Sequence, residues 1–348
     1  MRAGGVAALL LASSTLAAGA PPPDDRDARA QLALGTEHLR AGRLDDAQRH
    51  LERAASLDPR LPHLDLTLGQ LYSAKKLFAL AIEHLERAIR EEPEAPQGHY
   101  LLGITYSLMN ETPKATAALE RAARLSPDSA AFRYYLGLAY LQAERYPDAA
   151  EALAESVRLD PRSVDARSNL AWALMNVGKN GEAARVLLTA LERQPRTPSL
   201  WFLLGESLRR LGDTEKAIGY FEKALELDRS HADALFSLGT MYVLRQEPEK
   251  ATQYYRRLLS ADPSHAGAHY QLGKMLLRAG KVDEAVEHFE KSVAAQPALK
   301  AAHYQLARAY RLSGQTEKAE REAAIFQQLG SEQVDDASWR KDATAPRP

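Results

Sequence analysis

The chain has 348 residues, of which 45 are Lys or Arg and 46 are Asp or Glu, and none is Cys. The formal net charge of -1 disfavours bulk nucleic acid as the main partner, because domains that bind it carry a basic excess. The absence of Cys excludes disulfides, thiolate metal sites, a Cys nucleophile and a lipid-modified Cys. Length alone, at roughly 150 residues per domain, would suggest about two domains.

The first 20 residues have the pattern of a secretory signal peptide. One positive charge at Arg2 precedes an apolar run over residues 6–11, which continues weakly to residue 18 and is followed by Pro21. A membrane anchor is the alternative, but the run is short and interrupted by polar residues, whereas a spanning helix needs about 20 apolar residues. We therefore predict a signal peptide over 1–20, cleaved after Ala20 or one to three residues earlier, a linker over 21–27 and export.

From Ala28 onward the chain repeats every 34 residues, and internal repeats of this kind decide the fold. Position 7 of each repeat is Leu and position 20 is Ala, while position 8 is Gly in seven repeats. Position 32 is Pro in seven repeats: Pro59, Pro93, Pro127, Pro161, Pro195, Pro263 and Pro297. The predicted array covers residues 28–333 in nine units: 28–61, 62–95, 96–129, 130–163, 164–197, 198–231, 232–265, 266–299 and 300–333.

Each repeat is predicted to form two helices joined by a short turn. Apolar residues recur at helical spacing in two stretches, and the break between them often carries Gly, which adopts a left-handed backbone at little cost. Small side chains at positions 8 and 20 allow the two helices to cross closely. Other prolines are expected to open helices, where a missing N–H is tolerated. Those opening first helices are Pro62, Pro96 and Pro198; those opening second helices are Pro113, Pro147 and Pro248.

These columns resemble the tetratricopeptide repeat family, whose unit carries Leu, Gly or Ala, Tyr, Ala, an aromatic residue, Ala and Pro at the same positions. The sixth unit is a good example, with Trp201-Phe202-Leu203-Leu204-Gly205 followed by Ala217, Phe221 and Ala224. The resemblance implies an all-α, right-handed superhelical solenoid of about nine helix-turn-helix repeats. It also implies that first-helix residues line a concave groove, in which family members hold peptides, helices or protein partners.

The resemblance places aromatic, apolar and basic side chains in this groove. The aromatic row at position 5 comprises Tyr100, Tyr134, Phe202, Phe236, Tyr270 and Tyr304, although core packing is the favoured explanation of this column. Residues suited to a partner helix or extended peptide are Leu138, Leu141, Asn169, Trp172 and Met175. The basic side chains are Arg209, Lys274, Arg278, Arg308 and Arg311. They would either bind carboxylates of an acidic partner or form a solvated charged face.

The sequence carries no motif for catalysis, a metal or a cofactor. It lacks His-Glu-x-x-His, a phosphate-binding Gly-rich loop and Gly-x-Ser-x-Gly. His265 and His269 are four residues apart but have no third ligand nearby in the sequence. The histidines at position 4, His99, His269 and His303, are expected to pack between helices, and those at position 23, His50, His84 and His288, to face outward. We therefore predict no enzyme activity, no cofactor and no metal ion.

The sequence thus predicts an exported scaffold or adaptor that binds a peptide or partner helix in its concave groove. A bacterial cell-envelope assembly is the favoured setting, with the protein periplasmic or secreted, without a nucleic acid partner and without a membrane segment after signal removal. The alternative is an accessory subunit of an envelope enzyme or polysaccharide-export complex that presents substrate. Residues 334–348 are expected to form a disordered tail, in which Trp339 either docks on the last helix or serves as a partner motif. Partner identity and oligomeric state are left open.

Overall fold

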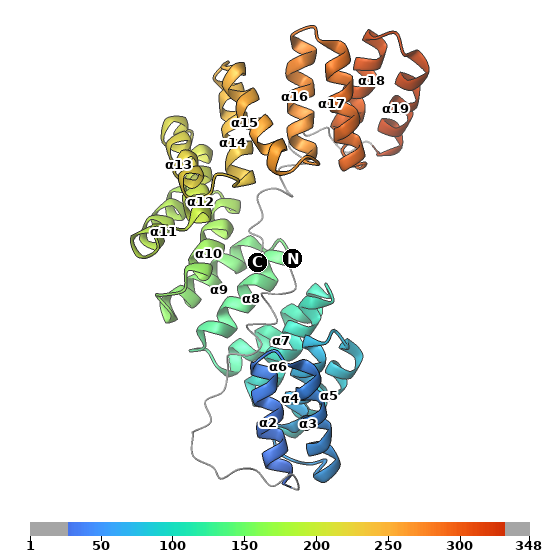
Figure 1. Cartoon of the computed structure of the whole chain (residues 1–348). Coiled ribbons are helices and arrows are strands. Elements are labelled where there is room, and N and C mark those ends of the chain that lie inside the picture. Colours follow the sequence, from blue (N-terminus) through green and yellow to red (C-terminus); the bar gives the residue numbers. More distant parts are fainter. Residues whose placement is uncertain (1–26, 331–348) are drawn as a thin grey trace. The chain divides into compact units, whose positions relative to one another are not determined.

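A computed structural model describes residues 27–330, which form eighteen helices, α2 to α19, and no strand (Figure 1). The all-α helical-repeat fold class is therefore confirmed. The predicted signal peptide, most of the predicted linker and the predicted tail lie outside the described residues. The division into nine units with the limits given above remains a prediction. No helix within residues 27–330 combines the length and the apolar character that crossing a membrane requires.

The helices alternate between two kinds. The even-numbered ones, the first of each predicted pair, are termed A helices, and the odd-numbered ones B helices. The A helices are α2 (Ala28–Arg40), α4 (Leu64–Ala74), α6 (Pro96–Leu108), α8 (Ala130–Gln142), α10 (Val164–Asn176), α12 (Pro198–Arg210), α14 (Ala232–Leu244), α16 (Ala266–Arg278) and α18 (Lys300–Leu312). The B helices are α3 (Leu44–Leu57), α5 (Phe78–Glu91), α7 (Thr112–Leu125), α9 (Tyr146–Leu159), α11 (Asn180–Arg193), α13 (Thr214–Leu227), α15 (Pro248–Ala261), α17 (Val282–Ala295) and α19 (Thr316–Gln328).

The chain divides into two compact units, with the boundary between Val177 and Gly178. The first unit holds α2 to α10 and the second holds α11 to α19. Within each unit, helices that are consecutive in the sequence pack against each other. Successive A helices of the first unit also contact one another, as do α16 and α18 in the second. Each unit therefore contains four helix hairpins stacked in chain order, with α10 after them in the first unit and α11 before them in the second.

The turn between an A helix and the next B helix has a left-handed residue at position 15. Gly occupies this position five times, with φ between 73° and 84°, at Gly42, Gly178, Gly212, Gly280 and Gly314. The other four turns have φ between 54° and 61° at Lys76, Asn110, Glu144 and Gln246. Glycine is therefore the unstrained solution at this turn but not a required one, because a residue with a Cβ adopts the same backbone at some cost.

Prolines open the helices as predicted, with one exception. Pro96 and Pro198 are the first residues of α6 and α12, and α7, α9 and α15 each carry Pro in the first turn. Pro62 does not open α4, which begins at Leu64. That prediction is wrong because His63, the residue after the proline, adopts a left-handed φ of 65° and cannot continue a helix from Pro62.

In seven of the described A helices, Gly at position 8 allows a close approach to the following B helix. A Cβ atom added to Gly137 would lie 2.5 Å from Leu153, and one added to Gly205 would lie 2.7 Å from the Phe221 ring. Both Leu153 and Phe221 are fully buried. The other glycines with the same relation to the residue 16 positions later are Gly35, Gly69, Gly103, Gly239 and Gly273. At these seven glycines the seam therefore has room for a hydrogen atom and not for a methyl group.

Candidate partner-binding surface

In the first unit, four of the predicted groove residues share the A helices α8 and α10. Asn169 of α10 donates from Nδ2 to the Tyr134 hydroxyl of α8 at 3.3 Å. Tyr134, Leu138 and Leu141 recur along α8, and all four side chains are half-buried. Burial and the nearby Asp165 carboxylate raise the pKa of Tyr134, so its hydroxyl keeps its proton at neutral pH. Tyr134, Leu138, Leu141 and Asn169 together are termed the α8–α10 surface.

The other groove residues predicted in the first unit are buried. Tyr100, Trp172 and Met175 are 8%, 9% and 2% exposed. The Tyr100 ring packs against Phe132, with ring centroids 4.8 Å apart, and against Tyr135 at 5.4 Å. These three side chains are therefore core residues. For Tyr100 this agrees with the core packing favoured for its column, whereas the placement of Trp172 and Met175 on an open groove lining is wrong.

The aromatic row continues into the second unit as core. Phe202, Phe236 and Tyr270 are at most 4% exposed. The Phe236 ring lies 5.4 Å from the ring of His265, the N-cap residue of the next A helix, so the start of that helix covers the aromatic side chain. Tyr304 of α18 is the exception at 49% exposed. The groove placement is therefore wrong for Phe202, Phe236 and Tyr270, which are core residues as the favoured explanation of this column expected, and Tyr304 remains open.

Arg209, predicted to bind a carboxylate of a partner, already binds one within α12. Its guanidinium donates from Nη2 and Nε to the two carboxylate oxygens of Glu206 at 2.6 and 2.8 Å, and Arg210 adds a third bond at 3.1 Å. The hydrogen bonds that Arg209 donates to Glu206 raise the pKa of the guanidinium. Glu206 is buried, and sequence reasoning missed it. Its signal was an acidic residue three and four positions before two arginines, the spacing at which helical side chains meet.

The remaining basic groove residues lie on α16 and α18. Neither helix contains Asp or Glu. Lys274 is half-buried, with its Nζ 5.0 Å from the centre of the Tyr270 ring. Arg278, Arg308 and Arg311 are exposed, and within residues 27–330 no ion pair joins them to a carboxylate. Their charge is therefore available to an anionic ligand.

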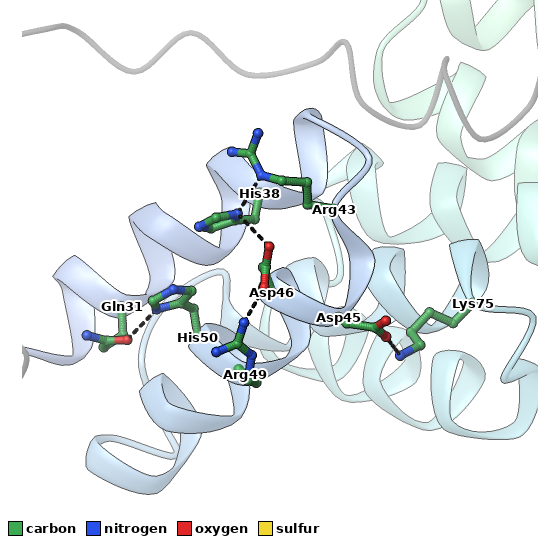
Figure 2. Close-up of polar contacts among 8 residues, drawn as sticks. All are labelled: Gln31, His38, Arg43, Asp45, Asp46, Arg49, His50 and Lys75. Carbon is green, nitrogen blue, oxygen red and sulfur yellow. Dashed lines mark hydrogen bonds and ion pairs between the residues drawn. The ribbon is translucent and has the colours of Figure 1, made fainter.

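Position 4 of an A helix and position 23 of its B helix form a recurrent polar pair. In the first hairpin, His50 Nδ1 lies 2.8 Å from Oε1 of Gln31 (Figure 2). The equivalent pairs are His84 with Asp65 at 2.5 Å, His269 with His288 at 2.9 Å and His303 with Glu322 at 2.6 Å. The prediction that His50, His84 and His288 face outward is wrong, because each turns back toward the A helix to meet a hydrogen-bonding group.

The adjacent carboxylates of Asp45 and Asp46 point to different partners (Figure 2). Asp45 accepts a hydrogen bond from Lys75 Nζ at 2.7 Å, which lowers the pKa of Asp45. Asp46 pairs with Arg49 and lies 3.7 Å from Nδ1 of His38. These are separate surface ion pairs and not an acid–base pair. Throughout residues 27–330, no three His, Asp or Glu side chains are grouped to hold a metal ion.

The His269–His288 pair predicts a stability that falls in acid. One ring must be neutral to accept a hydrogen bond across the 2.9 Å between the two Nδ1 atoms. Burial and the charge of His269 lower the pKa of His288 from its usual 6.5. A group whose pKa is lower in the folded state than in the unfolded state stabilises the fold at pH values above its unfolded-state pKa. This contribution is lost as the pH falls through its folded-state pKa. The free energy of unfolding should therefore fall as the solution is taken below about pH 6.5.

His288→Gln isolates this contribution from other acid effects. Urea unfolding at about pH 7.5 and about pH 5 should show a smaller loss of stability in the variant than in the parent protein. Equal losses in the two proteins would contradict the assignment to this pair.

A stack of helix hairpins with a fixed repeat and a glycine seam defines a helical-repeat solenoid. The profile of the Cilia and flagella-associated protein 70 C-terminal domain, a tetratricopeptide repeat region, matches residues 3–206, more than half of the chain. The profiles of Anaphase-promoting complex, cyclosome, subunit 3 and of Tetratricopeptide repeat match residues 211–292 and 276–341. The chain belongs to the tetratricopeptide repeat family, and its fold is that of a protein-interaction scaffold of this type. No match was found among curated proteins.

Solved structures with a similar fold include other tetratricopeptide repeat proteins. A tetratricopeptide repeat protein from Parabacteroides merdae ATCC 43184 is 19% identical with a TM-score of 0.52, and the match covers 68% of this chain and 93% of that one. The APC/C hetero-tetramer Cut9-Hcn1 gives 19% identity and a TM-score of 0.54 over 82% of this chain and 56% of that one. YrrB, a TPR protein with an unusual peptide-binding site, is 26% identical with a TM-score of 0.45. The match covers 54% of this chain and 97% of that one. The first two likenesses show the shared fold alone.

Proposed function

We propose that this protein is a non-enzymatic scaffold or adaptor that binds a peptide or partner helix along the open faces of its A helices, in the concave groove expected of the family. The α8–α10 surface is the observation that carries the proposal. There, half-buried Tyr134, Leu138 and Leu141 lie on the A helix α8, and the side-chain amide of Asn169 is held beside them by its bond to Tyr134. Apolar area combined with fixed hydrogen-bonding groups suits a bound helix or extended segment.

The basic residues of the second unit extend the proposal to an acidic partner. Arg278, Arg308 and Arg311 are exposed on A helices that hold no acidic residue. An arginine without an internal partner can form a bidentate bond with a carboxylate, which fixes both orientation and charge. Arg209 is left out of this set because Glu206 already occupies its guanidinium.

We further infer that the chain has no catalytic activity of its own and acts after export, in the periplasm or outside the cell, in a bacterial cell-envelope assembly. The signal-peptide pattern of residues 1–20 supports export. The absence of catalytic motifs from the sequence supports the scaffold role. An accessory subunit that presents substrate to an envelope enzyme or polysaccharide-export complex is the alternative. Glycan binding by the purified chain, without any protein partner, would favour that alternative.

Site-specific photocrosslinking in the native host tests the proposed surface. A benzophenone amino acid replaces Leu138 of α8 in one variant and Leu80 of the B helix α5, which is 42% exposed, in the control. Leu138 is preferable to Trp172, whose burial would mask the probe. The expected result is one dominant protein crosslinked from position 138 and much less of it from position 80. Equal crosslinking from the two positions would overturn the assignment of the partner to the A-helix face.

A further inference from the structure

The last A helix has one open face. Lys300, Tyr304, Arg308 and Arg311 recur at intervals of four, four and three residues, so they form a stripe along one side of α18. Leu312, one turn beyond Arg308, is 59% exposed, and Tyr304 is 49% exposed. Arg308 and Arg311 are also exposed. These five residues are termed the α18 face.

This face is open because no described helix follows to cover it. Tyr304 corresponds to Phe236, 68 residues earlier, whose ring is covered by His265 at the N-cap of α16. The residue 68 positions after His265 is Gln333, so Gln333 holds the corresponding position for Tyr304. The position that would cover Tyr304 therefore belongs to the segment directly after α19.

The same segment has a composition complementary to the α18 face. The face carries three basic side chains, and α18 has no acidic residue. Residues 331–339 contain Glu332, Asp335 and Asp336 and no Lys or Arg, together with the apolar side chains of Val334 and Trp339. Acidic side chains spaced among apolar ones match a surface on which arginines alternate with Tyr304 and Leu312.

The segment also starts in the right place. The Gly330 carbonyl oxygen accepts a hydrogen bond from Lys300 Nζ, at the beginning of the stripe. Arg308 and Arg311 lie eight and eleven residues further along α18, or about 12 and 17 Å at the rise of a helix. Five or six extended residues span at most about 17–22 Å. Asp335 and Asp336 can therefore reach both arginines from Gly330.

We propose that residues 332–339 of this chain bind in cis to the α18 face. Asp335 and Asp336 pair with Arg308 and Arg311, Val334 covers Tyr304, and Trp339 packs on Leu312. The segment takes the place that the first helix of a following repeat would occupy.

Photocrosslinking within the full chain tests this proposal. A benzophenone amino acid replaces Ala337, the protein is irradiated at low concentration, and the crosslinked peptides are mapped by mass spectrometry. Crosslinks within one chain to residues 304–312 are expected. Arg308→Glu with Arg311→Glu should reduce their yield about tenfold, because two ion pairs become repulsions. Adding Asp335→Lys and Asp336→Lys to that variant should restore the yield.

A second arginine pair provides the matched control. Arg185 and Arg193 of α11 are also exposed, and within residues 27–330 neither side chain is joined to a carboxylate. Arg185→Glu with Arg193→Glu makes the same change in net charge and should leave the yield unchanged. Crosslinks that map elsewhere, that join two chains, or that persist in Arg308→Glu with Arg311→Glu would overturn the proposal. The probe at Leu138 tests the scaffold function in the first unit, so failure of one proposal can be told from failure of the other.

Discussion

Replacing Phe289 by Ala is expected to lower the free energy of unfolding of the second unit by about 3–5 kcal/mol. The Phe289 ring is fully buried in α17, and its centroid lies 6.2 Å from that of Tyr270 in α16. It also fills the space over Gly273, where an added Cβ would be 2.7 Å from the ring. Removing the ring leaves a cavity between α16 and α17, and the residues that line this cavity lose their van der Waals contacts with the ring.

Urea unfolding followed by far-UV circular dichroism measures this loss. Leu244→Ala in α14 is the control, because Leu244 is 68% exposed. A substitution at such a site usually changes stability by less than about 0.5 kcal/mol. If Phe289→Ala unfolds at the same urea concentration as the parent protein, the ring does not hold the α16–α17 seam together.

Alanine should have opposite effects at two glycines of one hairpin. In Gly205→Ala, the new Cβ would lie 2.7 Å from two ring carbons of Phe221 and 3.1 Å from the Ala217 carbonyl oxygen. Phe221 is fully buried, so its ring would have to shift within a packed core to admit the methyl group. Overpacking of this kind costs about 1–3 kcal/mol. In the last hairpin, where position 8 is Ala307, the residue 16 positions later is Ala323 instead of an aromatic residue or Leu.

Gly219→Ala is the matched substitution in α13. A Cβ at Gly219 would meet nothing within 4 Å. Alanine in a helix interior is more favourable than glycine by about 0.5–1 kcal/mol, because glycine loses more backbone freedom on folding. Thermal unfolding should therefore shift down for Gly205→Ala and up for Gly219→Ala. A shift in the same direction for both would mean that helix propensity, and not the helix crossing, decides stability at Gly205.

The hairpins could be predicted from the sequence because their constraints are local. Pro96 and Pro198 open helices as the missing N–H requires, and the turn falls at position 15 whether that residue is Gly or not. Pro62 shows where local rules stop. The sequence does not reveal that His63 adopts a left-handed φ of 65°, because this conformation is uncommon for a residue other than Gly.

The candidate site was less predictable because exposure depends on neighbours. Phe236 and Tyr304 occupy the same position of the repeat, yet Phe236 is core and Tyr304 is open, since only Phe236 has a following A helix over it. Arg209 and Arg308 look equivalent as basic groove residues. Glu206 neutralises Arg209, whereas α18 offers Arg308 no acidic partner. Whether a side chain is buried or ion-paired depends on the residues packed around it. The residue types at one repeat position therefore do not predict it.

The sequence by itself determined the repeat length, the all-α class and the exclusion of Cys chemistry. These follow from periodicity, proline placement and composition, which do not depend on tertiary contacts. The length that at first suggested two domains is accounted for by stacked hairpins, and the structure groups them into two compact units. Only the tertiary structure decided which groove residues remain accessible. Tyr134, Leu138 and Asn169 stay at the surface of the first unit, and Tyr304, Arg308 and Arg311 at that of the second. The physical reason is that accessibility depends on what the next helix covers: the N-cap of α16 covers Phe236, α10 leaves Tyr134 half-buried, and no described helix follows Tyr304.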